Sequence, residues 1–269
     1  MRCVDPLGNV IQLPLSAKRI VCLVPSLTEL LYSLALTREL KGITKFCPER
    51  RIRIRSFTVV GGTKKVHYDR IKSLQPDLII ANKEANTPEI VSECQKIAPV
   101  YVSNVNTLDE AYDAIRDIAL LCDREEWAEN LINRIHISFI PVKTYSYHIK
   151  TAELCVAYLI WKKPYMVAAS GTFINNMLEK CGFKNAFAHR SRYPEVKLEE
   201  LVSDDTIDYL FLSSEPYPFK ENDVSAFAKA NKKAILVDGQ MFSWYGSKLQ
   251  ESPAYFIDLI KSLSSPAQI

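Results

Sequence analysis

The sequence contains few glycines and none of the glycine patterns that bind phosphate or carry a nucleophilic serine. Its eight glycines form no G-x-G-x-x-G, G-x-x-x-x-G-K-[ST] or G-x-S-x-G motif. The nearest approach is Gly61-Gly62-Thr63-Lys64, which we interpret as a tight turn. Paired histidines and an H-E-x-x-H motif are missing as well. The sequence therefore gives little support to catalysis.

Disulfide and metal-ligand patterns are also missing. The seven cysteines show no C-x-x-C spacing, and Cys22 and Cys155 lie within apolar runs. An odd count and apolar surroundings indicate reduced, buried thiols. None of the four histidines stands at ligand spacing from a cysteine. We therefore expect no disulfide framework and no metal bound by side chains.

Long apolar runs are absent. No stretch approaches the roughly 18 residues of a membrane span, and the opening MRCVDPLGNVIQLPLSAKRIV has no signal-peptide apolar segment. Cys3 has nothing apolar before it and does not resemble a lipid-attached cysteine. The sequence as given predicts a cytoplasmic protein, although a translation start placed too far downstream would hide a signal peptide.

Neither charge sign dominates. The 34 basic and 31 acidic residues leave a formal charge of +3, which is too small to indicate nucleic-acid binding. Hydrophobic residues at 48% and charged residues at 24% are typical of a folded globular protein. The length allows one large domain or two of roughly 120 residues.

Apolar strands and helices alternate in both halves of the chain. Strands that are apolar on both faces and separated by helices predict parallel sheets covered by helices. The expected strands lie at 20–24, 78–81, 100–105, 154–160, 209–213 and 234–237. The helices between them are expected at 67–74, 88–97, 172–181, 198–202 and 223–230, and a last helix is expected from 252 to about 263.

The middle of the chain is helical throughout. One apolar stripe begins at Leu108, and a second helical segment runs from about Arg124 to Phe139, where Pro141 should end it. We therefore expect three consecutive parts: an N-terminal α/β lobe at 1–106, a helical connector with the long backbone helix at 107–148, and a C-terminal α/β lobe at 149–269.

Aromatic residues gather in loops that follow the expected strands. Ligands of open parallel sheets bind at the carboxyl ends of the strands, so we predict an aromatic-lined cleft between the lobes for a large, flat or partly apolar ligand. The alternative for each residue is packing under its own loop. These aromatics are Phe46, Trp161, Tyr165, Tyr193, Phe242, Trp244 and Tyr245.

Charged residues form two further patterns. Asp69 and Glu199 each open a short helix that leads into a strand, where the helix dipole favours negative charge. Two interpretations of these carboxylates stay open: they cap their helices, or they have a functional role. The run RRIRIR at 50–55 is interpreted as a solvated edge strand, with an anionic ligand or a nucleic-acid backbone as the alternative.

Six segments, in order along the chain, resemble the periplasmic solute-binding proteins of cobalamin and iron–siderophore ABC importers. They are RIVCLVPSLTELLYSL, GITKFC, VGGTK, DRIKSLQPDLIIANKE, SRYPEVKLEELV and FSWYGSKL. The resemblance covers nearly the whole chain. It implies two α/β lobes joined by one long helix, a preformed cleft between them, and ligand binding without catalysis.

The resemblance also assigns roles to residues. Phe46 and Tyr193 stand at aromatic pocket positions of the cobalamin binders, whereas Asn82 replaces a pocket tryptophan. Asp69 and Glu199 match acidic residues that dock on arginines of the membrane permease. The other expected ligand contacts are Lys45, Lys83, Glu84, Trp161, Tyr165, Arg192, Phe242, Trp244 and Tyr245.

The expected ligand is cobalamin, cobinamide, haem or a ferric siderophore, whose metal is held by its own organic groups. No cofactor of the protein itself is expected. The resemblance implies a periplasmic or cell-envelope location, an ABC permease as partner if the protein is exported, a monomer, and no contact with nucleic acid or insertion into the membrane.

Two alternatives come from other classes of protein. The first is a cytoplasmic relative that acts as an enzyme or metal-cofactor chaperone, for which Cys47, Glu84 and His189 are the candidate titratable groups. The second is an interaction protein without a small ligand, in which the aromatics pack against one another.

Overall fold

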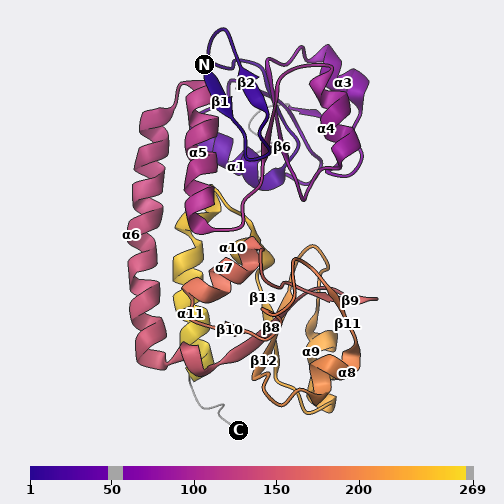
Figure 1. Ribbon diagram of the computed structural model, residues 1–269, viewed down its shortest axis with the longest axis vertical. Helices are drawn as coiled ribbons and strands as arrows, with labels where there is room; N and C mark the ends of the chain where they lie inside the picture. The colour runs from indigo at the N-terminus through magenta and orange to yellow at the C-terminus, as the bar shows by residue number, and fades with distance from the viewer. Residues whose placement is uncertain (48–56, 265–269) are drawn as a thin grey trace. The chain divides into compact units, whose positions relative to one another are not determined.

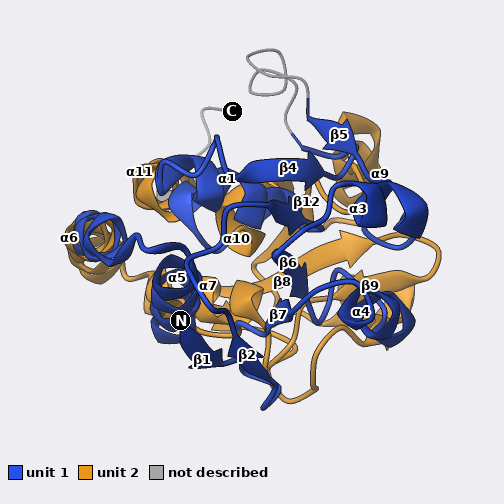
Figure 2. Ribbon diagram, turned by 90° about the horizontal axis from the view of Figure 1, so that it is seen from above, with its two compact units in different colours: residues 1–105, 109–134, 245–248 blue, residues 106–108, 135–244, 249–269 orange. Residues whose placement is uncertain are grey.

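A computed structural model describes residues 1–47 and 57–264, and its chain divides into two compact units. Unit 1 contains residues 1–105, 109–134 and 245–248, and unit 2 contains residues 106–108, 135–244 and 249–269 (Figure 2). Each unit is made of more than one stretch of the chain. The boundaries of the three parts expected from the sequence stay predictions. The basic run at 50–55 lies outside the described residues.

Unit 1 is built on a parallel sheet with strand order β5-β4-β3-β6-β7. Its strands are β3 (Ile20–Cys22), β4 (Leu40–Ile43), β5 (Thr58–Val59), β6 (Leu78–Asn82) and β7 (Val100–Ser103). The helices of this unit are α1 (Pro25–Ser33), α3 (Tyr68–Ser73), α4 (Pro88–Gln95) and α5 (Leu108–Cys122). A separate antiparallel hairpin, β1 (Arg2–Val4) with β2 (Val10–Gln12), precedes them.

Both faces of this sheet are covered because alternate residues of its strands point to opposite sides. Ile79 and Val102 pack with Ile90 and Cys94 of α4 on one face, and α3 lies on the same side as α4 (Figure 1). Tyr101, the neighbour of Val102, is fully buried, and its hydroxyl donates to Asp117 of α5 at 3.0 Å.

The long helix α6 (Glu125–Ile149) begins in unit 1 and ends in unit 2. It passes through Pro141, so the prediction that Pro141 ends this helix was wrong. Proline lacks the N–H that would bond to the carbonyl four residues earlier. That carbonyl belongs to Ile137, which is exposed, so water can hydrate it and the loss is tolerated.

Unit 2 contains a mixed sheet with strand order β11-β9-β8-β12-β13, and β10 also pairs with β8. Its parallel pairs are β10 with β8, β8 with β12 and β12 with β13, whereas β9 pairs antiparallel with both β8 and β11. The sequence predicted a parallel sheet in this half, and the structure corrects that prediction for β9 alone, which runs antiparallel to its two neighbours. The connection between β8 and β9 is far shorter than the dozen residues that a parallel crossover needs. The strands are β8 (Cys155–Trp161), β9 (Tyr165–Val167), β10 (Lys184–Asn185), β11 (Glu195–Val196), β12 (Tyr209–Ser213) and β13 (Ala234–Val237).

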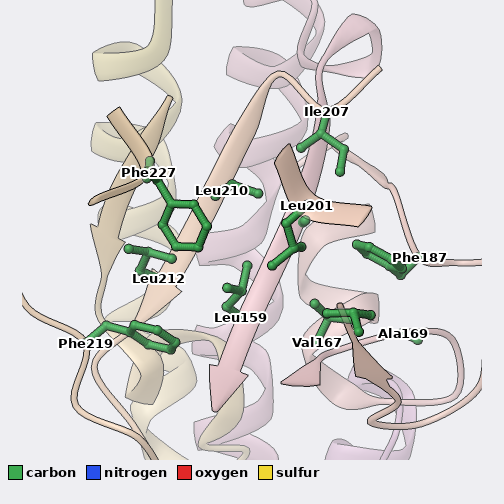
Figure 3. Close-up of a cluster of buried hydrophobic side chains, with 13 residues drawn as sticks. Leu159, Val167, Ala169, Phe187, Leu201, Ile207, Leu210, Leu212, Phe219 and Phe227 are labelled. Atoms are coloured by element: carbon green, nitrogen blue, oxygen red, sulfur yellow. The ribbon is translucent and has the colours of Figure 1, made fainter. Parts of the chain in front are cut away.

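Helices cover both faces of the second sheet as well. Leu159 and Leu212 point toward α8 and α9, where they pack with Leu201 and Phe227 (Figure 3). Their neighbours Tyr158 and Phe211 point to the opposite face and pack around Phe242. The helices are α7 (Phe173–Lys180), α8 (Leu198–Ser203), α9 (Glu221–Lys229), α10 (Gly239–Ser243) and α11 (Ser252–Ser264), with short 3-10 turns at Thr151–Glu153 and Ser247–Gln250.

The structure confirms the predicted α/β fold class, with a five-stranded parallel sheet in unit 1 beside the β1–β2 hairpin, a six-stranded sheet in unit 2, and one long helix continuing from the first unit into the second. Within residues 1–47 and 57–264, no helix has the length and apolar character needed to cross a bilayer. All seven cysteines are free thiols, and all except Cys155 are buried.

Candidate functional site

Strand β4 of unit 1 leads directly into the predicted contacts Lys45 and Phe46. The Phe46 ring is 55% exposed, and the Lys45 Nζ lies 5.0 Å from its centroid. Gly62 supports the ring from the neighbouring turn, since a Cβ at Gly62 would come within 3.1 Å of Phe46 Cε2. The turn is held by Gly61, whose φ of +124° is strained for other residues, and whose carbonyl accepts from the Lys45 N–H at 2.8 Å.

Asn82 is the last residue of β6, and both polar atoms of its side chain form hydrogen bonds within unit 1. Its Oδ1 accepts from the backbone N–H groups of Glu84 and Ala85, both at 2.9 Å. Its Nδ2 donates to Tyr245 Oη at 2.6 Å and to the carbonyl oxygen of Ser103 at 3.1 Å. Asn82 is buried. It therefore shapes the loop that carries Lys83 and Glu84, which are both exposed.

Tyr245 belongs to unit 1, although the residues on either side of 245–248 belong to unit 2. Its hydroxyl lies 2.9 Å from Ser103 Oγ in addition to its bond from Asn82. Burial raises the pKa of Tyr245 well above the usual tyrosine value, so the phenol stays neutral. The predicted contacts Asn82 and Tyr245 are therefore hydrogen-bonded to each other. For Tyr245 this agrees with the alternative that the aromatic residue packs inside the protein.

In unit 2, Trp161 and Tyr165 flank the turn between β8 and β9. Trp161 is 40% exposed and makes an edge contact with Tyr217, with ring centroids 5.8 Å apart. Tyr165 is half-buried and packs on Phe227 of the core at the same centroid separation. Trp161 thus exposes part of its ring to solvent, whereas the Tyr165 ring packs against the core.

Arg192 and Tyr193 form a cation–aromatic pair before β11. The Arg192 guanidinium carbon lies 5.7 Å from the Tyr193 ring centroid, and its Nη1 donates to Asn106 Oδ1 at 2.7 Å. Arg192 has a φ of +62°, a strained conformation that turns the chain sharply at this point. This pair repeats in unit 2 the arrangement of Lys45 over Phe46 in unit 1.

Phe242 does not line a surface. Its side chain is 0% exposed and packs against Tyr158 and Phe256, with ring centroids 5.1 and 4.8 Å away. The prediction of Phe242 as a ligand contact is corrected, because α10 turns this residue into the core. Trp244, two residues later, is only half-buried.

Glu215 holds Trp244 and was not predicted. Its Oε1 accepts from Trp244 Nε1 at 2.7 Å and from Ser243 Oγ at 3.0 Å. Burial raises the pKa of Glu215 and the charge of Asp238 adds to that rise, whereas hydrogen bonds from Ser243, Trp244 and Gln240 oppose it. A sequence signal was present, because Glu215 follows β12 at the carboxyl end of the sheet, as the predicted contacts follow their own strands.

The groups named for an enzymatic site do not form a cluster within either unit. Cys47 and Glu84 belong to unit 1, and His189 belongs to unit 2. Burial raises the pKa of Cys47 although Thr28 and Thr44 bond to it, which disfavours the reactive thiolate. Among the described residues, no three His, Cys, Asp or Glu side chains are grouped so that they could hold a metal ion.

Comparison with known proteins bears directly on this fold. Residues 20–240 match the family model described as periplasmic binding protein. The chain belongs to the periplasmic binding protein family. This confirms the resemblance seen in the sequence, and members of this family bind small solutes for ABC importers.

Individual members of the family are only distantly similar. The vitamin B12-binding protein of Vibrio cholerae serotype O1 is 24% identical over 193 residues, which cover 70% of this chain and 68% of that protein. The Fe(3+)-citrate-binding protein YfmC of Bacillus subtilis is 26% identical over 197 residues, covering 70% and 61%. The crystal structure of the petrobactin-binding protein YclQ of Bacillus subtilis matches with a TM-score of 0.78 at 18% identity, covering 99% of each chain. At this identity the structural match shows the fold alone.

Each unit has an exposed carboxylate near the start of a short helix, at the two positions that the sequence singled out. Asp69 lies in the first turn of α3 and Glu199 in the first turn of α8, and both are exposed. In α8 the capping role falls to the next residue, since Glu200 accepts from the Lys197 N–H at 2.8 Å and pairs with Arg190. Glu199 is thus not needed as the cap.

Proposed function

We propose that this protein is the solute-binding component of an ABC importer for a metal chelate that combines a flat, partly apolar organic part with anionic groups. One observation carries the proposal. At a loop near a strand end, each unit places a cation over an aromatic ring: Lys45 over Phe46 and Arg192 over Tyr193. Rings offer apolar faces for stacking, and the adjacent cations offer partners for carboxylates.

The names of the relatives support a chelated metal as cargo. The curated relatives are named for vitamin B12 and Fe(3+)-citrate, and the solved structure for petrobactin. Asn82 stands where cobalamin binders have a tryptophan, and its side chain is already used by the loop. Within the class of chelates we therefore propose anionic members, haem or a ferric siderophore, ahead of cobalamin or cobinamide.

We further propose binding without turnover. The metal of such a ligand is held by the ligand's own donors, so the protein needs no metal site of its own. Buried Cys47, with its raised pKa, is a poor nucleophile. The protein would act as a monomer in the cell envelope, where ABC importers receive their solutes.

Docking on the permease is proposed for Asp69 and Glu199. Exposed carboxylates contribute to association mainly through electrostatic complementarity, and arginines are their natural partners. Asp69 also borders a surface hollow lined in part by Tyr68, Lys72 and Glu93, which offers room for an incoming side chain. Replacing both carboxylates by alanine should abolish uptake in cells that carry the importer while leaving ligand affinity in solution unchanged.

The ligand proposal is tested by fluorescence titration with haem, ferric citrate, ferric siderophores, cobalamin and cobinamide. The chain has three tryptophans, and Trp127, on α6, is not among the candidate contacts. A Trp127→Phe background therefore leaves Trp161 and Trp244 as reporters. We expect saturable quenching, after correction for ligand absorption, by an anionic chelate at micromolar or lower concentration.

Matched alanine variants separate ligand contact from general effects. Lys45→Ala and Tyr193→Ala should each weaken binding by about tenfold, the loss expected for one charged or stacking contact. Lys233→Ala is the control, because Lys233 lies over Tyr209 at 5.5 Å in the same kind of pair, at the opposite, amino ends of β13 and β12. Equal losses in all three variants, or no quenching by any chelate, would overturn the proposal.

A further inference from the structure

The C-terminal half of α6 differs in charge from its N-terminal half. The helix begins with Glu125, Glu126 and Glu129, but residues 130–152 contain no Asp or Glu at all. In the same stretch Arg134, Lys143 and Lys150 supply positive charge, although Lys150 is paired with Glu153 just beyond it, 3.7 Å away. This change of charge occurs within one unbroken helix (Figure 1).

The same half presents large apolar side chains to solvent. Tyr147 is 81% exposed, Ile137 63% and Ile140 59%. At about 100° per residue, these three and Lys143 fall within an arc of about 120° and extend over about 15 Å of helix. They form one continuous surface, which we term the α6 outer face.

The opposite side of this half is anchored in unit 2. Val142 is fully buried, and Phe139 packs against Phe256 of α11 with ring centroids 6.3 Å apart. On the flank, Lys261 of α11 lies 4.6 Å from the Tyr145 ring centroid. The helix is therefore held by its inner side, and the α6 outer face is not needed to fold the unit.

We propose that the α6 outer face rests on an anionic phospholipid surface. A helix with aliphatic and aromatic residues on one face and lysine beside them lies in the membrane interface, with its apolar side chains between the head groups. Anionic lipids attract the nearby cations, Lys143 above all. Residues 130–152 contain no Asp or Glu, and the Glu153 carboxylate that follows them is paired with Lys150. Lysine-bearing surfaces are disfavoured in the centres of protein interfaces, and a second copy docked on the same face would bring like charges together.

This contact goes beyond solute binding and does not depend on the identity of the ligand. It would hold the protein at the membrane surface, close to where a permease lies. Each cation at the surface strengthens binding by about fivefold, and salt weakens that contribution by screening. The apolar side chains make the contact persist once the charges have brought the helix to the surface.

The test is co-sedimentation of the full-length protein with phosphatidylcholine vesicles, with and without phosphatidylglycerol, over a range of salt concentrations. We expect binding to the anionic vesicles only, weakening as salt increases. The double variant Ile140→Ser with Tyr147→Ser should bind at least about tenfold more weakly, and Lys143→Glu about fivefold or more. Thermal unfolding checks that these surface changes leave the fold intact.

Trp127→Ser is the matched control. Trp127 is a large exposed apolar residue on the same helix, but it lies among the glutamates of the N-terminal half. Its replacement should leave vesicle binding unchanged. The inference would be overturned by equal binding to neutral vesicles, by no binding to anionic vesicles at low salt, or by an equal loss of binding in the control. It would also be overturned if the protein formed a dimer without lipid and the double variant abolished that dimer. Fluorescence titration of the same variants distinguishes failure of this inference from failure of the proposed function.

Discussion

The two units stabilise the loops at their strand ends in different ways. In unit 1, the side chain of Asn82 bonds to its own loop and to Tyr245. In unit 2, Phe242 fills the core, and the carboxylate of Glu215 holds Trp244. Both units nevertheless carry a cation stacked on an exposed or half-buried ring. A place at the carboxyl end of a sheet therefore does not by itself make a residue a ligand contact.

The largest effect should come from the core aromatic of unit 2. Phe242→Ala removes a fully buried ring and should lower the free energy of unfolding by about 3–5 kcal/mol. Trp161→Ala, which removes a partly exposed ring, should cost about 1 kcal/mol or less. Urea unfolding followed by circular dichroism measures both. A loss below about 1 kcal/mol for Phe242→Ala would show that this residue is not a core residue.

A somewhat smaller effect is expected from the polar network of unit 1. Asn82→Ala leaves two loop N–H groups and the Tyr245 hydroxyl without this partner and should cost about 2–3 kcal/mol. Tyr245→Phe removes a single hydroxyl and should cost about 1 kcal/mol. The double variant should lose less than the sum, because the two residues share one hydrogen bond. Additive losses would mean that Asn82 and Tyr245 act independently.

The smallest effect is a pH dependence confined to unit 2. A carboxyl group whose pKa is raised in the folded state binds its proton more tightly there than in the unfolded chain. Stability from this group is therefore present below the unfolded pKa of Glu215 and lost as pH rises through the folded pKa. Glu215→Gln should remove that loss. The free energy of unfolding of the variant, measured relative to wild type, should therefore increase as the pH is raised from acid to neutral. A constant difference across pH would contradict this assignment.

Much of the fold could be predicted from sequence periodicity. The apolar runs at 78–81 and 209–213 lie within strands β6 and β12, because residues buried on both faces leave a continuous apolar signal. Pro141 misled the prediction, since its cost depends on whether the orphaned carbonyl can be hydrated, which a local pattern does not show. The antiparallel strand β9 was missed because three connecting residues and a short strand carry little periodicity.

The candidate site, too, was predicted from the sequence only in part. The sequence by itself determined the α/β alternation, the family and the places of Lys45, Phe46, Asp69 and Glu199, because each depends on residue types beside a strongly patterned element. Only the tertiary structure decided that Phe242 faces the core, that Asn82 binds Tyr245 163 residues away, and that Glu215 holds Trp244. Burial and long-range hydrogen bonds depend on which chain segments meet, and no local pattern encodes that.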